Sequence, residues 1–298
     1  MTDTDTTAPD TTSARTQSWR AQYVDRQTLQ RAALYVVMYG VAALFFLPYW
    51  RMFQLSVTPS AVIATGEFHW IPPAVSFDIW KRYLLNEPIL LQWTWNTFVI
   101  SGLTTLIVLV VDSMVAFSLT RLDWPGQRAL LSVIIASFMI PAYVNIIPLF
   151  TLINDLGMIN SYWAIILPFA AGPLGVFLLV QFFRDIPEEL EEAARLDGFS
   201  VPRIYAQIIL PLSTPILTAL GLFVFIWSWN QFLWPLIVLN SDKLYTLPIG
   251  VVTLRSVNAL SPNVIMTSTA IASLPLFIVF LLFQDKLISS VQMQASTG

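Results

Sequence analysis

The chain has 298 residues, of which 56% are hydrophobic and only 11% are charged. An ordinary soluble domain carries roughly 25% charged residues, so this composition predicts a membrane protein. The net charge is −3 and there is no basic block, which argues against nucleic acid as a partner. The chain has no Cys and one His, His69, so disulfides and the usual His/Cys zinc sites are excluded and no metal site is predicted.

Charge and hydropathy divide the chain into three parts. Residues 1–31, which begin MTDTDTTAPDTTSART, are rich in Thr and Asp and poor in apolar residues, and they predict a disordered cytoplasmic tail. Residues 32–285 should form a transmembrane domain, because a bilayer core needs runs of about 20 apolar residues. Residues 286–298 are expected to be a cytoplasmic C-terminal tail.

Six apolar runs in the middle part predict six membrane-spanning helices. The runs lack the alternation of barrel strands, so the expected fold class is an all-α polytopic membrane protein. Glycine and proline near 141, 148 and 172–175 indicate kinks around a cavity. The predicted spans are residues 32–50, 88–119, 129–154, 156–183, about 212–238 and about 266–283.

The Lys and Arg residues set the predicted orientation. A cytoplasmic N-terminus leaves ten of the 15 basic residues on the inside, as the positive-inside rule requires. With six spans, both termini would lie in the cytoplasm, and the protein would be a multi-pass component of the cell (plasma) membrane. The segment between the fourth and fifth spans would then also be cytoplasmic.

That segment, EELEEAARLDGFSVPRIYAQIILP, is the most polar stretch of the second half of the chain. Asp185 and Glu188 have the spacing of a capping box, and acids fill the first turns of the helix that follows. Gly198 stands where a left-handed residue would end this helix, and Ser200 with Pro202 would start a second one. One apolar stripe is expected on the first helix, made of Ile186, Leu190, Ala193 and Ala194.

The segment therefore predicts a helical hairpin that is amphipathic but lies outside the bilayer. Such an element needs a protein surface to dock against. Its sequence, EAARLDG followed nine residues later by IILP, resembles the EAA loop of ABC-importer permeases. In that family, the EAA loop fits a cleft of the cytoplasmic ATPase subunit.

Further stretches are similar to the carbohydrate permeases of the maltose-transporter type and follow the family's order. The resemblance covers about residues 33–298. Its quoted motifs are FSLTRLDWPGQR (117–128), GMINSYWAIILPFAAGPLGVFLLVQFFRDIPEELEEAARLDG (157–198), WSWNQFLWPLIVL (227–239) and LYTLPIG (244–250). The chain lacks the basic, Gly-containing tail common in that family, which leaves open whether its own tail contacts the ATPase.

The resemblance implies a permease subunit that forms half of the pore of a binding-protein-dependent importer for a sugar or oligosaccharide. The implied partners are two copies of an ABC ATPase subunit, a second, non-identical permease and an extracytoplasmic solute-binding protein. None of the 11 glycines is followed by Lys, so the chain has no GxxxxGK[ST] phosphate loop. We therefore expect no catalysis and no cofactor in this chain, with ATP and Mg bound by the ATPase.

Two sets of candidate site residues follow. The resemblance assigns ATPase coupling to Glu191, Glu192, Ala193, Ala194, Asp197, Gly198, Leu210 and Pro211. Aromatic faces and amides suit sugar hydroxyls, which suggests a substrate path at Asn230, Trp227, Trp229, Gln231 and Asn96. The amides could instead be interhelical hydrogen-bond partners.

Alternatives stay open at this stage. Within the family, the solute could be a glycerol phosphodiester or another polar molecule, although no cluster of Lys or Arg lies inside a span to meet a phosphate. From a different class, a stand-alone secondary carrier would show internal repeats and paired ionisable residues near the midplane. Asp112 is the one acid inside a predicted span, and it could carry protons or only face a polar neighbour.

Overall fold

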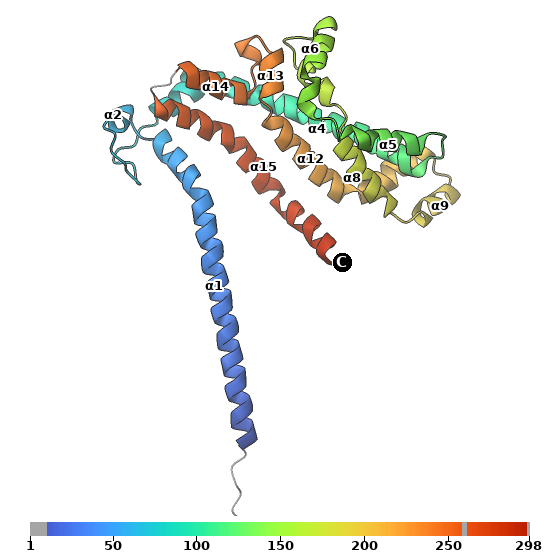
Figure 1. Cartoon of the computed structure of the whole chain (residues 1–298), viewed down its shortest axis with the longest axis horizontal. Helices are drawn as coiled ribbons and strands as arrows, with labels where there is room; N and C mark the ends of the chain where they lie inside the picture. The colour runs from blue at the N-terminus through green and yellow to red at the C-terminus, as the bar shows by residue number, and fades with distance from the viewer. Residues whose placement is uncertain (1–10, 258–260, 297–298) are drawn as a thin grey trace, which may run out of the picture. The chain divides into compact units, whose positions relative to one another are not determined.

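The computed structural model describes residues 11–257 and 261–296, and this part of the chain is helical without strands (Figure 1). It contains two compact units, Met1–Gln54 and Leu55–Gly298. The all-α class predicted from the sequence agrees with this architecture.

The first unit consists of most of α1 (Thr11–Ser56), an unbroken helix with Pro48 inside it. Its segment Thr28–Ser56 is long and apolar enough to cross a membrane. Because the helix begins at Thr11, residues 11–31 are helical where the sequence predicted a disordered tail. Residues 1–10 of that predicted tail lie outside the described residues.

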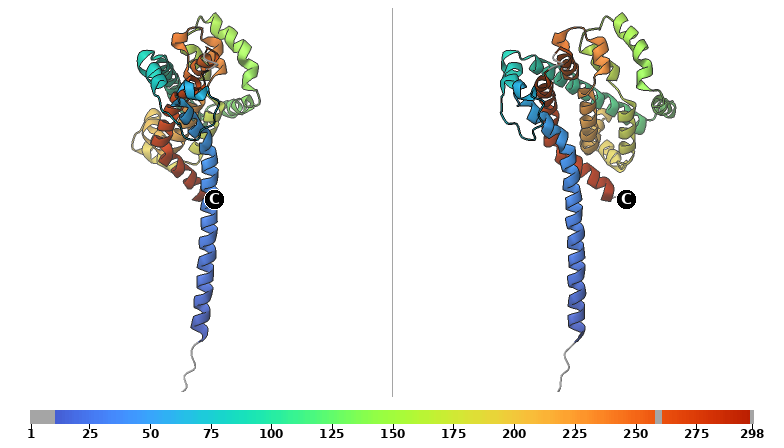
Figure 2. Two further views of the ribbon diagram at one scale, coloured as in Figure 1. Left: turned by 90° about the vertical axis from the view of Figure 1, so that its left-hand side faces the viewer. Right: turned by 60° about the vertical axis from the view of Figure 1, so that its left-hand side comes forward.

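The second unit is built around the long helix α4, which contacts both α8 and α12. Its last helix, α15, is drawn in red in the two further views of Figure 2. This helix runs past the predicted boundary at 285, so the expected C-terminal tail is helical as far as Ser296. The elements are α2 (Ser60–Ile63), α3 (Asp78–Lys81), η1 (Arg82–Asn86), α4 (Ile89–Arg121), α5 (Gln127–Ser137), η2 (Ala142–Asn145), α6 (Ile146–Asp155), α7 (Trp163–Ile166), η3 (Leu167–Phe169), α8 (Pro173–Arg184), α9 (Glu189–Leu196), α10 (Val201–Ile204), η4 (Tyr205–Ile209), α11 (Leu210–Leu212), α12 (Thr214–Trp229), α13 (Leu233–Val238), η5 (Asp242–Leu244), α14 (Leu247–Val257) and α15 (Pro262–Ser296).

Within the described residues, three helices are long and apolar enough to span a membrane, or up to five if each of two bent helix pairs is one span. The straight ones are Thr28–Ser56, Ile89–Arg121 and Pro262–Phe283. One bent pair joins α7 and η3 to α8 at 43°, and the other joins the helix over Val201–Leu212 to α12 at 77°. The count of six spans therefore stays a prediction.

The third and fifth predicted spans differ from the structure. Residues 129–154 are not one helix, because the chain is extended at Pro141 and separates α5 from η2 and α6. Proline lacks the amide hydrogen that would continue the helix. The predicted fifth span ends early, at Trp229, and α13 starts only at Leu233. The kink expected near 172 is present, with Gly172 capping α8 and Pro173 opening it.

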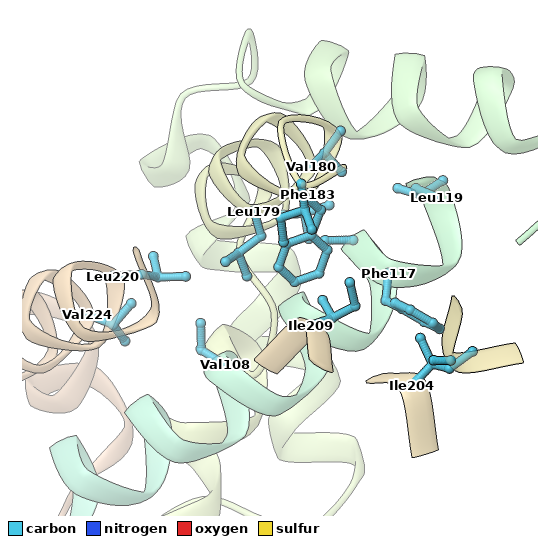
Figure 3. Packing of buried hydrophobic residues seen from close by; sticks show 14 residues of the cluster. Val108, Phe117, Leu119, Leu179, Val180, Phe183, Ile204, Ile209, Leu220 and Val224 are labelled. Atoms are coloured by element: carbon cyan, nitrogen blue, oxygen red, sulfur yellow. The ribbon is translucent and has the colours of Figure 1, made fainter. Parts of the chain in front are cut away.

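The largest cluster of buried apolar side chains in the described residues is formed by α4, α8, α12 and the hairpin, and it includes the buried side of α9. Phe183 is fully buried in its middle, with Phe117, Ile204 and Ile209 around it (Figure 3). Burial of large side chains contributes roughly 1.5–3 kcal/mol each, so this cluster holds the hairpin firmly on α4 and α8.

Candidate functional site

The predicted hairpin is present as helix, glycine corner and helix. The first helix, α9, ends at Leu196, and Gly198 follows with a φ of +80°. Ser200 has extended backbone angles and starts the second helix, which runs through α10, η4 and α11. Only glycine adopts a positive φ without steric cost, so the corner depends on this residue.

The capping box expected at Asp185 and Glu188 is wrong. Asp185 instead follows α8 as its C-cap, and Glu188 precedes α9 without any side-chain capping bond. The reason is that α8 continues to Arg184, which leaves no extended residue at 185 to begin a new helix.

Arg121, at the C-terminal end of α4, anchors the hairpin. Its side chain is only 3% exposed, and its Nε lies 2.8 Å from Oε1 of Glu191 while Nη1 lies 3.5 Å from Oε1 of Glu188. Its Nη2 donates to the carbonyls of Phe183 (2.5 Å) and Ile186 (2.6 Å) at the end of α8. One guanidinium therefore ties α4 to α8 and to α9.

The acids of α9 have different environments. The side chain of Glu191 is 5% exposed, and burial raises the pKa of its carboxyl while Arg121 and Arg195 oppose that rise. Glu192 is exposed. The contact with a partner protein expected at Glu192 is sterically open, whereas Glu191 binds within the chain.

The predicted apolar stripe of α9 is divided between two sides. Ile186 and Ala194 are buried in the cluster with Phe183. Leu190 and Ala193 are exposed, and Leu196 on the same side is 90% exposed. This exposed side, with Glu189 and Glu192, is called the α9 outer face below.

The remaining coupling candidates lie elsewhere on the hairpin. Asp197 is the exposed C-cap of α9, next to Gly198. Leu210 and Pro211 belong to α11, just before the 77° bend into α12. They are therefore placed at the exit of the hairpin and not on the α9 outer face.

Three of the five substrate-path candidates meet at a second site. Trp227, Asn230 and Gln231 line a cavity of about 520 Å³ at the C-terminal end of α12. Asn230 donates from Nδ2 to the carbonyl of Ile226 (2.7 Å), which fixes its orientation. Trp227 packs edge-on against Phe169 of η3, with ring centroids 5.0 Å apart. The other lining residues are Tyr143, Phe223, Ile226, Phe232 and Leu233.

The other two candidates do not reach this cavity. Trp229 is 2% exposed and packs against Phe225 in a different buried cluster. Asn96 is fully buried and donates to the carbonyls of Lys243 (2.8 Å) and Tyr245 (2.9 Å). It also accepts from Tyr162 (2.7 Å). Asn96 is thus an interhelical hydrogen-bond partner, which is the alternative left open for the amides.

Sequence reasoning missed three residues of these sites. Arg121 was counted only as an inside charge, and Tyr205 was not singled out although its hydroxyl lies 2.7 Å from that of Ser113 on α4. Tyr143 of η2 was hidden inside a presumed span. For Arg121 a signal existed, since it is a lone cation at the end of a long apolar run.

In the described residues, no group of three or more His, Asp or Glu side chains could hold a metal ion. His69 lies outside the helices, 3.4 Å from Glu67.

Comparison with known proteins gives the family. Residues 113–292 match the family described as "Binding-protein-dependent transport system inner membrane component". This match covers more than half of the chain, so the chain belongs to that family of ABC transport permeases. It is accordingly an inner-membrane component of a transport system that depends on a binding protein.

Curated relatives extend the match to nearly the whole chain. The arabinooligosaccharides transport permease AraQ of Bacillus subtilis is 32% identical over 91% of this chain and 97% of its own length. The trehalose transport permease SugB of Mycobacterium tuberculosis is 28% identical over 92% and 99%. The sn-glycerol-3-phosphate transport permease UgpE of Brucella abortus is 36% identical over 64% and 68%.

A solved structure has the same fold. It is a chain in the crystal structure of a bacterial ABC transporter involved in the import of the acidic polysaccharide alginate. The TM-score is 0.77 over 88% of this chain and 97% of that chain, at 22% sequence identity.

Proposed function

We propose that this chain is the membrane-spanning permease subunit of an ATP-driven importer for a sugar or oligosaccharide. It forms half of the translocation pore with a second, non-identical permease. Its 185–211 hairpin docks in a cleft of a separate ABC ATPase subunit, of which the complex holds two copies. An extracytoplasmic binding protein delivers the solute, and both termini lie in the cytoplasm.

The α9 outer face is the observation that carries this proposal. Leu190, Ala193 and Leu196, the last of them 90% exposed, lie together on this face among acids, and an exposed apolar patch with a polar rim marks a surface for a protein partner. Acids flank it, which suits a cleft with basic residues. The opposite side of α9 is fixed to α4 by Arg121, so a partner that moves this face moves the end of α8 with it.

The cavity beside Asn230 supports a neutral, hydroxyl-rich solute. Its lining combines aromatic faces with two side-chain amides and includes no Lys or Arg. Tyrosine and tryptophan rings cover the apolar faces of sugars, and amides bind hydroxyls in both directions. The relatives AraQ and SugB carry sugar names.

A phosphorylated solute is the alternative within the family, and the relative UgpE favours it. A phosphate carries about two negative charges and calls for basic partners. The cavity lining of this chain contains no basic side chain, so binding of a phosphorylated solute would depend on basic residues of the second permease.

ATP and Mg bind to the separate subunit in this proposal, because the sequence has no Gly-Lys pair for a phosphate loop. A stand-alone secondary carrier would need ionisable pairs inside the spans. Asp112 is bound instead to a backbone amide, that of Gly172.

The test is purification of the tagged chain from native membranes, followed by uptake in vesicles with a panel of labelled arabinooligosaccharides, trehalose and sn-glycerol 3-phosphate. We expect an ABC ATPase and a second permease to co-purify in stoichiometric amounts, and ATP to drive uptake of one of the sugars. Uptake of glycerol 3-phosphate alone would contradict the sugar assignment. Absence of an ATPase from a transport-competent preparation would contradict the importer class.

A further inference from the structure

We propose that Asp112 is a positioning residue that, together with Arg121, fixes α8 to α4 at both ends, so that the two helices move as one body. This inference rests on the proposed coupling role of the hairpin. It gives a physical reason for a buried acid inside a transmembrane helix.

Asp112 lies at the N-terminal end of α8. Its side chain is fully buried, and Oδ1 accepts a hydrogen bond from the amide of Gly172 (3.1 Å), the residue that caps this helix. The first amides of a helix have no partners within the helix and carry partial positive charge. Oδ1 of Asp112 therefore gives the Gly172 amide a partner that an apolar side chain would not supply, while Oδ2 is buried without a hydrogen-bond partner.

Gly175 leaves the room that the carboxylate occupies. A Cβ on Gly175 would lie 2.0 Å from Oδ2 and 3.0 Å from Cγ of Asp112, far inside van der Waals contact. A Cβ on Gly172 would lie 3.8 Å from Oδ2, an ordinary contact distance. The requirement for glycine is thus specific to position 175.

Arg121 lies at the opposite end of α8, where the charge of the helix dipole has the opposite sign. Its guanidinium binds two carbonyls there, those of Phe183 and Ile186. A cation is the charge that a helix C-terminus stabilises. Asp112 and Arg121 are nine residues apart on α4, which is about 13.5 Å at 1.5 Å per residue. The 12-residue α8 is about 18 Å long, and the two side chains reach the remaining distance to its ends.

One bend separates the N-terminus of α8 from the wall of the cavity. The chain bends by 43° between η3 and α8, in the break that contains Gly172, whose amide Asp112 binds. On the other side of this bend, Phe169 packs against Trp227, which lines the cavity. Motion of α9 is therefore carried through α8 to a defined point beside the aromatic wall of the proposed sugar path.

The test is a double-mutant cycle in the purified complex, with uptake of the panel sugar that the wild type accumulates, measured per ATP hydrolysed. We expect Asp112→Ala and Gly175→Ala each to lower this ratio about tenfold, the size of coupling seen between residues in contact. In the double variant, the new methyl group meets no carboxylate, and its remaining close neighbour is the terminal Cδ2 of Leu220 at 3.3 Å, which a small side-chain shift relieves. The double variant should therefore match Asp112→Ala, whereas independent effects would lower the ratio about a hundredfold.

Control variants distinguish the role of Asp112 from the role of the hairpin. Gly172→Ala should retain the wild-type ratio, and Asp112→Ala should retain its ATPase subunit, because the α9 outer face is unchanged. If Gly175→Ala fails to insert in the membrane, the Asp112→Ala background should restore insertion. A hundredfold loss in the double variant, a wild-type ratio in Asp112→Ala, or loss of the ATPase from that variant would each overturn the proposal.

A second readout measures the rigid body directly, since the chain has no native Cys to remove. Spin labels at Val110→Cys on α4 and Gln181→Cys on α8 should keep one distance with and without ATP in the wild-type background. In Asp112→Ala the distance distribution should broaden. A wild-type distance that changes with ATP would contradict the proposal.

Discussion

Glu191 and Glu192 are adjacent on α9, but their environments differ. The Glu191 carboxylate is buried and forms an ion pair with Arg121, whereas the Glu192 side chain is exposed on the α9 outer face. The motif alone does not distinguish them, because the partner of Glu191 lies 70 residues earlier in the chain. Their substitutions should therefore fail in different ways.

Glu191→Ala should loosen the hairpin itself, because it leaves Arg121 buried without its nearest carboxylate. Breaking a buried ion pair costs about 3–5 kcal/mol, and Glu188 and the carbonyls bound to Arg121 place the loss at the low end of that range. Hydrogen exchange of the 189–204 amides should become faster. Unchanged protection in this segment would show that the pair does not hold the hairpin.

Glu192→Gln should leave that exchange unchanged and weaken retention of the ATPase subunit about threefold to tenfold, as expected when one charge at an interface loses its partner. The measurement is the amount of ATPase that co-purifies at increasing salt. Asp123→Gln, which removes an acid outside the hairpin, serves as the control. Equal retention in Glu192→Gln and wild type would remove this acid from the docking surface.

Asn230→Leu should lower uptake while the complex assembles normally, because the Asn230 side chain lies at the cavity and is exposed. Asn96→Leu is the matched contrast, since it leaves two carbonyls and the Tyr162 hydroxyl without the partly buried hydrogen bonds to Asn96, at about 1–3 kcal/mol per group. That variant should lose thermal stability in detergent. Normal uptake in Asn230→Leu, or loss of assembly, would place Asn230 outside the substrate path.

The grouping of Trp227 with Trp229 shows what local sequence could have predicted. Residues two apart on an α-helix point to nearly opposite sides, so both rings cannot line one cavity. The structure has Trp227 at the cavity and Trp229 in the core. In contrast, the binding of Asp112 to Gly172 joins positions 60 residues apart, and no local pattern predicts it.

At the scale of elements, the helix–glycine–helix conformation of the hairpin was predicted because most of its signals are local, although the capping box at Asp185 was not found. Gly198, the acids of the first turn and the Ser200 start each act within a few residues. At Pro141 the sequence predicted a kink within one span, but the helix stops there, and the predicted fifth span continued past the end of α12 at Trp229. Apolar composition extends across these breaks, so hydropathy alone does not reveal where a helix stops.

Gly198→Val tests the hairpin as a coupling element. A β-branched residue at a φ of +80° is strained by about 1–2 kcal/mol or more, and no neighbouring atom lies within 4 Å of the added Cβ, so the effect comes from the backbone alone. We expect normal membrane insertion but loss of ATPase retention or of ATP-driven uptake. Gly198→Asn should be milder, because Asn tolerates positive φ.

Gly40→Val, in the first helix, is the control for the added volume, since Gly40 has no positive φ and no atom within 4 Å of an added Cβ. It should retain uptake and ATPase retention. If Gly198→Val behaves like this control, the angle between the two hairpin helices is not what couples the subunits.

At the scale of the whole molecule, α4 connects the two proposed functional regions. It carries Arg121 at the hairpin and Asp112 at the bend beside the cavity, and it packs against α8 and α12. In the proposed function, the chain supplies a path for motion and a partner supplies the work, because this sequence has no phosphate loop.

Purified alone, the chain should therefore hydrolyse no ATP above the background of an empty preparation. Addition of the ATPase subunit and the second permease should give hydrolysis that the loaded binding protein stimulates. Release of inorganic phosphate measures both. Hydrolysis by the isolated chain would contradict the assignment of ATP and Mg to a separate subunit.

The most direct test of the whole account is solute uptake into proteoliposomes that contain the complete complex, with ATP inside and binding protein outside. We predict accumulation of labelled sugar that requires ATP, the ATPase subunit and the binding protein together, and that continues when proton and sodium gradients are collapsed. Accumulation by this chain alone, driven by a proton or sodium gradient without ATP, would contradict the account.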